Sequence, residues 1–342
     1  MAYTLEQLEE ALGSVYSVRL AHLPTPLEPA PRLSAALGDV EIWIKRDDCT
    51  GLAFGGNKTR QLEYTMGQAV AGYYKGVLQG AASQSNHCRQ IAAAAAQLGL
   101  RCHLLLQRDS HAPTPGHPAQ GNLLLDSLFG AEIHWTDAPL GKAFDEAKKA
   151  LAEKLRAEGE SVYLIGGVTG KAYGAVGYVK AMCEMVRQWG DSAPDYLYTC
   201  ASTATHLGLV TAREALGLRT RVEAIAPIVW DYDARLDLQR HVPTVAALLG
   251  IDLIGKPNAE DIHLDEGYVG PAYAVMTPEA REAIELTART EGILLDPAYS
   301  GKAMAALIDH VRRGVVPPGS KVVFLHTGGT PALFCYADEL TA

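Results

Sequence analysis

The sequence has no excess of positive charge and no long apolar run. Its 342 residues carry a formal net charge of -9, so it lacks the basic surface that neutralises the phosphates of nucleic acids or anionic membranes. The longest apolar stretch, IAAAAAQLGL, is too short to span a bilayer, and no basic and apolar secretory signal is visible at the start. We therefore expect a cytoplasmic protein that acts on small molecules, with no nucleic-acid or membrane partner.

Paired cysteines and zinc-type spacings are missing as well. The six cysteines form no CxxC pair, and the cytosol keeps such thiols reduced, so we expect them to be buried or incidental. None of the eleven histidines belongs to an HExxH motif, and His111 and His117 lie in a segment broken by prolines, HAPTPGH. The sequence thus predicts no metal site.

Several catalytic signatures are absent. No GxGxxG motif opens a helix, no GxSxG motif occurs, and the acidic residues show no paired-carboxylate pattern, which disfavours dehydrogenases, serine hydrolases and glycosidases. Gly51 and Gly56 have the spacing of a nucleotide-phosphate loop, but Asn57 intervenes before Lys58. Since that loop needs its lysine directly after the second glycine, binding of a nucleotide triphosphate is disfavoured too.

Segments typical of strands and helices alternate along most of the chain. Apolar runs such as VEIWIKR (40–46) and KGVLQGA (75–81) alternate with segments of helical periodicity such as residues 57–73. This order predicts an α/β fold with open, mostly parallel sheets flanked by helices. The length exceeds the size at which one hydrophobic core usually keeps growing, so we expect two domains. Ligands bind such sheets at the carboxyl ends of the strands.

Four loops that follow predicted strands stand out: GLAFGGNK (51–58), GAASQSNH (80–87), TCASTAT (199–205) and HTGGTP (326–331). In the first, a charged lysine in the first helical turn opposes the helix dipole, an objection that a neutral amine or an imine at Lys58 avoids in part. In the second, Ser85 and Asn86 are good helix caps, but His87 and Arg89 after them favour an anionic ligand such as a carboxylate. A solvated lysine and a plain helix cap are the alternatives.

The third and fourth loops each allow two interpretations. Ser202, Thr203 and Thr205 offer hydroxyl groups beside free backbone N–H groups, which suits a phosphate but also a well-capped helix. The pair Gly328 and Gly329 follows a buried strand, and it indicates either a tight turn or a close approach of the backbone to a ligand.

Taken together, these motifs resemble the D-cysteine desulfhydrase and 1-aminocyclopropane-1-carboxylate deaminase family, and they are also similar to L-cysteate sulfo-lyase. These proteins are pyridoxal-phosphate enzymes of the tryptophan-synthase β fold type. The resemblance covers nearly the whole chain. Its carriers are LPTPLEPAPRLS (23–34), IKRDDCTGLAFGGNKTRQLEY (44–64), QSNHCRQIAAAAAQLGL (84–100), EGILLDPAYSGKAMAALID (291–309) and FLHTGGTPALF (324–334).

The resemblance implies an architecture and a cofactor. A smaller domain, residues 61–167, would be inserted into a larger cofactor-binding domain made of residues 1–60 and 168–342, and the enzyme would be a homodimer. The cofactor would be pyridoxal 5'-phosphate, joined to Lys58 as an imine, and the substrate a small amino acid.

The resemblance also assigns roles to residues of the four loops and of two further segments. Besides Lys58, the implied catalytic residues are Ser85, Tyr273 and Tyr299. Ser85, Asn86 and His87 would hold the substrate carboxylate, with Asn86 also contacting the phenolic oxygen of the cofactor. The residues implied to surround the rest of the cofactor are Ala201, Ser202, Thr203, Ala204 and Thr205 at its phosphate, and Ser300 and Thr327 near its pyridine nitrogen.

Two residues bear on the substrate. The cyclopropane deaminases place a glutamate where this chain has Ser300, and a serine hydroxyl cannot hold a proton on the ring nitrogen by charge. A neutral ring is a weaker electron sink, which disfavours opening of a cyclopropane and suits loss of thiolate or sulfite. His87 likewise resembles the desulfhydrases and sulfo-lyases, because the deaminases carry a glutamine there.

The leading interpretation is therefore a carbon–sulfur lyase that eliminates sulfide or sulfite from D-cysteine or L-cysteate and releases pyruvate and ammonia. The alternatives are a deaminase or β-replacement enzyme that acts on another small amino acid, and a fold relative that binds its ligand without turnover. Three departures from the family pattern bear on this choice. They are Gln61 in place of a lysine, Thr203 in place of a glycine, and AYAVMT (272–277) in place of a segment with GYG.

Overall fold

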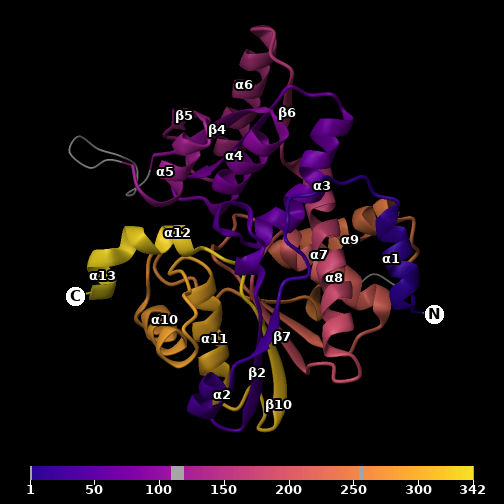
Figure 1. Cartoon of the computed structure of the whole chain (residues 1–342), viewed down its shortest axis with the longest axis vertical. Helices are drawn as coiled ribbons and strands as arrows, with labels where there is room; N and C mark the ends of the chain where they lie inside the picture. Colours follow the sequence, from indigo (N-terminus) through magenta and orange to yellow (C-terminus); the bar gives the residue numbers. More distant parts are fainter. Residues whose placement is uncertain (1, 109–118, 254–256, 342) are drawn as a thin grey trace.

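The computed structural model describes residues 2–108, 119–253 and 257–341, which fold around two β-sheets (Figure 1). A six-stranded sheet has the order β1-β2-β10-β7-β8-β9, and a four-stranded sheet has the order β5-β4-β3-β6. The strands of the larger sheet are β1 (Leu27–Pro29), β2 (Val40–Lys45), β7 (Tyr196–Cys200), β8 (Arg221–Ile225), β9 (His263–Asp265) and β10 (Ser320–Leu325). Those of the smaller sheet are β3 (Gly76–Ala82), β4 (Arg101–Gln107), β5 (Glu132–Thr136) and β6 (Val162–Leu164).

Parallel pairing dominates both sheets. In the described part of the chain, β1 with β2 is the antiparallel pair, and the other seven paired neighbours are parallel. This arrangement confirms the predicted α/β class with mostly parallel sheets. All four strands of the smaller sheet lie within the predicted inserted domain, although the domain boundaries themselves stay a prediction.

Helices cover both faces of each sheet. They are α1 (Leu5–Gly13), α2 (Pro31–Leu37), α3 (Asn57–Ala71), α4 (Asn86–Leu98), α5 (Gly121–Leu128), α6 (Lys142–Ala157), α7 (Gly167–Trp189), α8 (Ala204–Leu216), α9 (Ala234–Leu249), α10 (Pro278–Glu291), α11 (Ser300–Arg312), α12 (Thr330–Leu333) and α13 (Ala337–Thr341). One core joins α1, α7, α8 and α9 to the larger sheet, and another joins α2, α10 and α11 to its opposite face. Among the described residues, none of the helices has the length and apolar character needed to cross a bilayer.

Two helices differ from the pattern in the sequence for local reasons. α7 begins at Gly167, before the first residue of clear helical periodicity at Tyr173, because Gly166 and Gly167 carry positive φ and lead directly into the helix. α9 contains Pro243 in its interior, which removes a backbone donor and interrupts the expected pattern.

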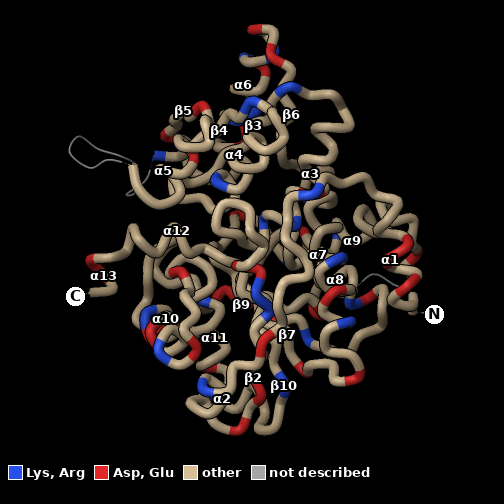
Figure 2. Tube along the Cα trace, in the orientation of Figure 1, with Lys and Arg blue, Asp and Glu red and all other residues tan. Residues whose placement is uncertain are grey.

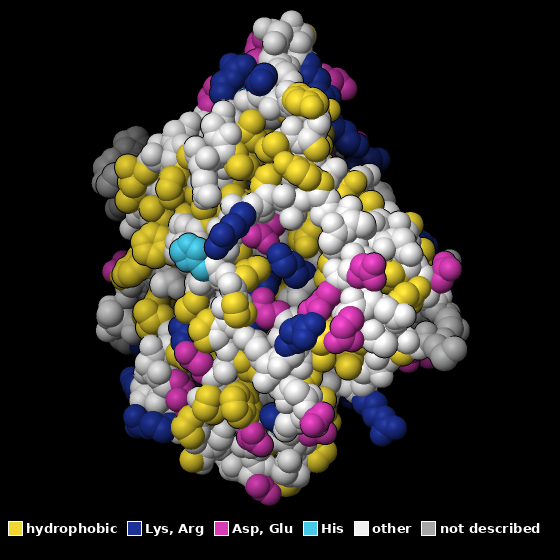
Figure 3. Space-filling model, turned by 45° about the vertical axis from the view of Figure 1, so that its right-hand side comes forward, with side chains coloured by type: hydrophobic (Ala, Val, Ile, Leu, Met, Phe, Trp, Pro, Cys, Tyr) yellow, Lys and Arg dark blue, Asp and Glu magenta, His cyan; other side chains and the backbone are white. Residues whose placement is uncertain are grey.

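Charged residues of both signs are interspersed over the two parts of the molecule (Figure 2). The face in Figure 3 is hollowed near its centre, where acidic and basic side chains meet between scattered apolar ones. This mixed surface agrees with the absence of a basic face expected from the composition.

A buried charge network fixes the start of α3 to the larger sheet. Arg60 donates from Nε and from one terminal nitrogen to the two carboxylate oxygens of Asp47, each at 2.8 Å, and Arg60 and Asp47 are almost fully buried. The same guanidinium donates to Glu184 of α7 at 2.9 and 3.0 Å. Burial alone would raise the pKa of Asp47, but the charge and hydrogen bonds of Arg60 hold it below its usual value. Asp47 therefore stays ionised in the interior.

Three further groups complete this network. Thr25 Oγ1 donates to Asp47 at 2.8 Å, Tyr178 donates its hydroxyl to Asp47 at 2.7 Å, and Lys45 of β2 pairs with Glu184. The network thus joins the N-terminal segment, β2, α3 and α7, and a buried charge needs such partners to remain charged.

We expect Arg60→Met to lower the free energy of unfolding by about 3–5 kcal/mol, because it leaves Asp47 buried without its main partner. Urea unfolding followed by circular dichroism measures this change. The control is Arg312→Met, which removes a half-exposed pair with Glu282 and should cost below about 1 kcal/mol. Similar losses in the two variants would contradict the dependence of the fold on Arg60.

Candidate active site

The first and fourth loops touch through their glycines. Asn57 N donates to Thr327 O at 2.9 Å. A Cβ on Gly328, whose φ is +91°, would lie 2.7 Å from Gly56 Cα, and a Cβ on Gly56 would lie 3.1 Å from Thr327 O. The glycines therefore serve the close approach of two backbones, and the two loops form a continuous floor at the carboxyl ends of β2 and β10.

Lys58 lies on this floor with a free amine. It is the second residue of α3, its side chain is partly buried, and Lys58 Nζ has no hydrogen-bond or ion-pair partner among the described residues. Burial lowers the pKa of Lys58 to about 8. A solvated lysine would keep an ordinary pKa near 10.4, so the amine of Lys58 is neutral in a substantial fraction of molecules near neutral pH. This fits the expectation that the helix start does not carry a permanent charge.

The second loop caps α4. Ser85 Oγ accepts from the backbone N–H groups of His87 and Cys88 at 3.2 Å each, so the helix-cap interpretation is confirmed while the hydroxyl hydrogen of Ser85 remains available to a ligand. Asn86 Oδ1 accepts from Arg89 and Asn122, whereas Asn86 Nδ2 donates to no described residue. Burial and the nearby Lys58 lower the pKa of His87 well below its usual value, so its imidazole is neutral.

Arg89 does not serve an anion at this helix start. Its guanidinium is fully buried and donates to Gly55 O, Asn86 Oδ1 and Asn122 Oδ1 at 2.7–2.8 Å. The expectation that His87 and Arg89 together favour a ligand carboxylate is therefore wrong for Arg89, because its side chain turns inward and ties α4 to the first loop.

The third loop presents backbone donors at the start of α8. The N–H groups of residues 202–205 donate to no described residue, as usual for a first helical turn. Thr203 has φ -137°, so a residue with a side chain adopts this position without the left-handed conformation that a glycine would allow. Trp230 Nε1 donates to Ser202 Oγ at 3.0 Å and holds the other side of the loop.

Thr205 links the third loop to the first. Its hydroxyl oxygen accepts from Asn57 Nδ2 at 2.9 Å and from Gln61 Nε2 at 2.8 Å, and all three residues are buried. Gln61, which departs from the family lysine, thus contributes a neutral hydrogen bond that joins α3 to α8.

Ser300 and Thr327 lie at the same end of the larger sheet. Ser300 Oγ donates to Asp296 Oδ1 at 2.7 Å and accepts from Asp296 N at 2.8 Å. Asp296 is fully buried, and burial raises its pKa. A Cβ on Gly329 would lie 2.4 Å from Asp296 Oδ1, so this carboxyl also packs against the fourth loop. Thr327 Oγ1 has no hydrogen-bond partner among the described residues.

The two predicted tyrosines form a pair. The hydroxyls of Tyr273 and Tyr299 are hydrogen-bonded, and their ring centroids lie 6.0 Å apart in an edge-on arrangement. Burial and the Tyr273 hydroxyl raise the pKa of Tyr299 well above its usual value, so Tyr299 keeps its proton. Ala274 follows with φ +60° at a position where the family has glycine, so this loop retains the glycine-like conformation despite the substitution.

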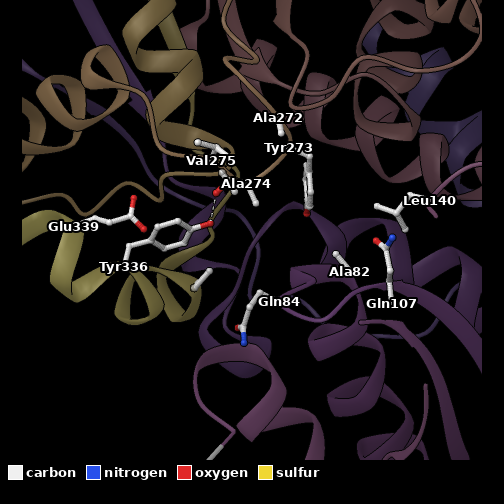
Figure 4. A pocket seen from close by; sticks show the side chains of 12 residues that line it. Ala82, Gln84, Gln107, Leu140, Ala272, Tyr273, Ala274, Val275, Tyr336 and Glu339 are labelled. Atoms are coloured by element: carbon white, nitrogen blue, oxygen red, sulfur yellow. Dashed lines mark hydrogen bonds between the residues drawn. The ribbon is translucent and has the colours of Figure 1, made fainter. Parts of the chain in front are cut away.

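Tyr273 also borders a cavity of about 430 Å³ (Figure 4). Ala82, Gln84 and Gln107 come from the ends of strands of the smaller sheet, and Tyr273 points toward them from the loop before α10. Tyr336 closes the other side and donates its hydroxyl to Ala274 O at 2.6 Å. Each of the two sheets thus contributes a wall, as a shared cleft requires.

Sequence reasoning missed three residues that hold these groups in place. Lys302 Nζ donates to Val269 O at 2.5 Å and ties the loop that carries Tyr273 to α11. Asp296 and Trp230 orient Ser300 and Ser202. Asp296 lies four residues before Ser300, a spacing that signals a capping side chain, whereas nothing in the sequence pairs Trp230 with Ser202.

The cysteines do not form a second centre. All six are free, and Cys88, Cys102, Cys183 and Cys200 are buried. Cys49 is exposed and Cys335 is half-buried, so these two are not buried as expected. His111 and His117 lie outside the described residues.

Known proteins match the chain over most of its length. The family described as pyridoxal-phosphate dependent enzyme matches residues 18–328. The chain is 36% identical over 321 residues to a 1-aminocyclopropane-1-carboxylate deaminase of Pseudomonas syringae pv. tomato, which covers 92% of this chain and 94% of that protein. It is 38% identical over 322 residues to a D-cysteine desulfhydrase of Salmonella typhi, which covers 93% and 95%. The solved structure of an ACC deaminase homologue has a TM-score of 0.86 and 32% identity and covers 98% of each chain.

We expect Thr205→Val to lower the free energy of unfolding by about 1–3 kcal/mol, because it leaves the buried amide nitrogens of Asn57 and Gln61 without an acceptor. The control is Thr205→Ser, which retains the hydroxyl and should lose less. Thermal unfolding of the two variants, side by side, measures the difference. Equal losses would mean that the methyl group of Thr205, and not its hydroxyl, holds α3 to α8.

The pKa of Lys58 gives a second measurable expectation. In cofactor-free protein, the rate of amine acylation at Lys58 should rise with pH and reach half its maximum near pH 8, because only the neutral amine reacts. Lys142, which is exposed on α6, should need a pH near 10.4. Mass spectrometry of the two peptides after pulse labelling measures both. Coincident profiles would show that Lys58 is an ordinary solvated lysine.

Proposed function

The chain belongs to the family of pyridoxal-phosphate dependent enzymes, and we propose that it catalyses α,β-elimination from a cysteine-like amino acid. The substrate would be of the D-cysteine or L-cysteate type, and the products would be pyruvate, ammonia and sulfide or sulfite. Family membership confirms the predicted enzyme class, cofactor and fold. A cytoplasmic homodimer stays part of this proposal, supported by the resemblance to the family.

The residues present fit pyridoxal phosphate. An amine whose pKa is lowered to about 8 can link to an aldehyde, and the N–H groups at the start of α8 suit a phosphate dianion. Asn86 Nδ2 and Thr327 Oγ1 have no partner among the described residues and can bond the polar edge of a ring. We therefore assign the linkage to Lys58, the phosphate to residues 201–205, and the ring contacts to Asn86, Thr327 and Ser300.

The bound cofactor supplies an electron sink that stabilises negative charge at Cα of an attached amino acid. Lys58 Nζ, once released from its link, is suited to accept the Cα proton because its pKa lies near the working pH. The substrate carboxylate would accept from the hydroxyl of Ser85 and the side-chain amide of Asn86, with the neutral imidazole of His87 beside it. This holds the substrate by hydrogen bonds without a paired cation.

The tyrosine pair is placed to assist the leaving group. Tyr299 keeps its proton at any physiological pH, and its hydroxyl is bonded to that of Tyr273, which borders the cavity. A protonated phenol can donate to a departing sulfur or sulfonate oxygen and can be reprotonated through its neighbour. We propose Tyr299 as the proton donor and Tyr273 as its link to the cavity.

The observation that carries the choice of substrate is the hydrogen bonding of Ser300. Its hydroxyl hydrogen is used on Asp296 Oδ1, and one lone pair accepts from Asp296 N. Ser300 can then offer only a neutral acceptor to a ring nitrogen, which leaves that nitrogen unprotonated and limits the electron sink. Elimination of a good leaving group needs less stabilisation at Cα than opening of a cyclopropane ring. Ring-opening deamination is the second candidate, favoured by the 36% identity to the deaminase.

The test is a product assay with purified enzyme on D-cysteine, L-cysteine, L-cysteate and 1-aminocyclopropane-1-carboxylate. We expect pyruvate with sulfide or sulfite from D-cysteine or L-cysteate, and no 2-oxobutanoate from the cyclopropane substrate. Lys58→Ala should lose activity by at least about 10²-fold and should lose the visible absorption band that borohydride bleaches in the wild type. Release of 2-oxobutanoate as the main product would establish the deaminase instead.

A further inference from the structure

Two histidines and a glutamate meet on the smaller sheet, away from the four loops. His103 lies on β4, and Glu132 and His134 lie on β5, the strand beside it (Figure 1). His103 is in register with Glu132, and His134 follows two residues later, so the three side chains stand on one face of the sheet. They lie toward the amino ends of these strands, whereas the cavity is bordered by Gln107 at the carboxyl end of β4.

The three donor groups are spaced as the ligands of a tetrahedral metal ion. His103 Nδ1 lies 3.3 Å from His134 Nε2. Glu132 places one carboxylate oxygen 3.6 Å from His103 Nδ1 and the other 3.4 Å from His134 Nε2. A zinc ion with bonds of about 2.0–2.1 Å to nitrogen has neighbouring ligand atoms about 3.3–3.4 Å apart. The three atoms therefore outline one face of such a tetrahedron.

The opposite side of His103 is held as it is in metal sites. His103 Nε2 lies 3.1 Å from Glu160 Oε2, and Glu160 in turn pairs with Arg101 at 2.9 Å. A carboxylate at Nε2 places the ring hydrogen there and leaves the lone pair of Nδ1 facing His134 and Glu132. His103 is almost fully buried, so this orientation is fixed by packing as well.

The groups of α6 that face the cluster add little net charge. Lys154 and Glu158 both influence His134, and they pair with each other at 3.9 Å. The side chains of His134 and Glu132 are 23% and 63% exposed, which leaves a path from solvent and room for a fourth ligand.

We propose that His103, Glu132 and His134 bind one divalent transition-metal ion of the zinc class, with water as the fourth ligand. Two imidazoles and one carboxylate suit Zn²⁺ and disfavour Mg²⁺ and Ca²⁺, which prefer all-oxygen ligands. The ion would clamp β5, the edge strand, to β4 and so stabilise the smaller sheet. The site is separate from the proposed reaction, and it corrects the sequence-based expectation of no metal, because the ligands come from two strands and match no linear zinc spacing.

Equilibrium dialysis of the holoenzyme against Zn²⁺, with metal content measured by mass spectrometry, tests this proposal. We expect one Zn²⁺ per chain with the wild type and a higher melting temperature than in a chelator. His134→Gln and Glu132→Gln, both at partly exposed positions that should fold, are expected to weaken binding by at least about tenfold. Glu160→Gln should weaken it by about 10–100-fold through the orientation of His103.

Two controls separate this site from others. His263→Gln changes a half-buried histidine of β9 in the larger sheet, and it should leave zinc binding unchanged. Cys49→Ser removes the exposed thiol and should also leave it unchanged. No bound zinc in the wild type, unchanged affinity in His134→Gln, or loss of zinc in Cys49→Ser would each overturn the proposal.

Discussion

The buried pair between Arg60 and Asp47 is the contact on which the rest of the site depends. It lies two residues after Lys58 and anchors the first turn of α3 to the end of β2 and to α7. Because both partners are almost fully buried, the pair holds only in one geometry, and a shift of α3 would leave charges unpaired in the interior. The position of the reactive amine is thus set by a charge network that never touches a ligand.

The parallel sheets bring distant loops together. The loops after β2, β7 and β10 leave the same edge of the larger sheet, and the loop after β3 comes from the smaller one. Neutral hydrogen bonds then join them, from Asn57 and Gln61 to Thr205 and from Asn57 to Thr327. The floor of the site is therefore rigid, while the cavity above it lies between the two sheets.

The departures from the family pattern are accommodated by local structure. Gln61 finds an acceptor in Thr205, Thr203 has an ordinary negative φ, and Ala274 keeps a glycine-like backbone with the help of Tyr336. Each change removes a charge or a glycine without leaving a buried polar group unpaired. The site is therefore compatible with cofactor binding by dipoles and hydrogen bonds where relatives use a lysine.

The sequence by itself determined the α/β class, the four loops and the lysine, because hydrophobic periodicity and short motifs are local properties of the chain. The cap at Ser85 followed from the same local chemistry. Only the tertiary structure decided that Arg89 turns inward, that Trp230 holds Ser202, and that His103 meets His134 across two strands. These contacts join residues far apart in sequence, and their partners are set by strand order and register, which no local pattern records.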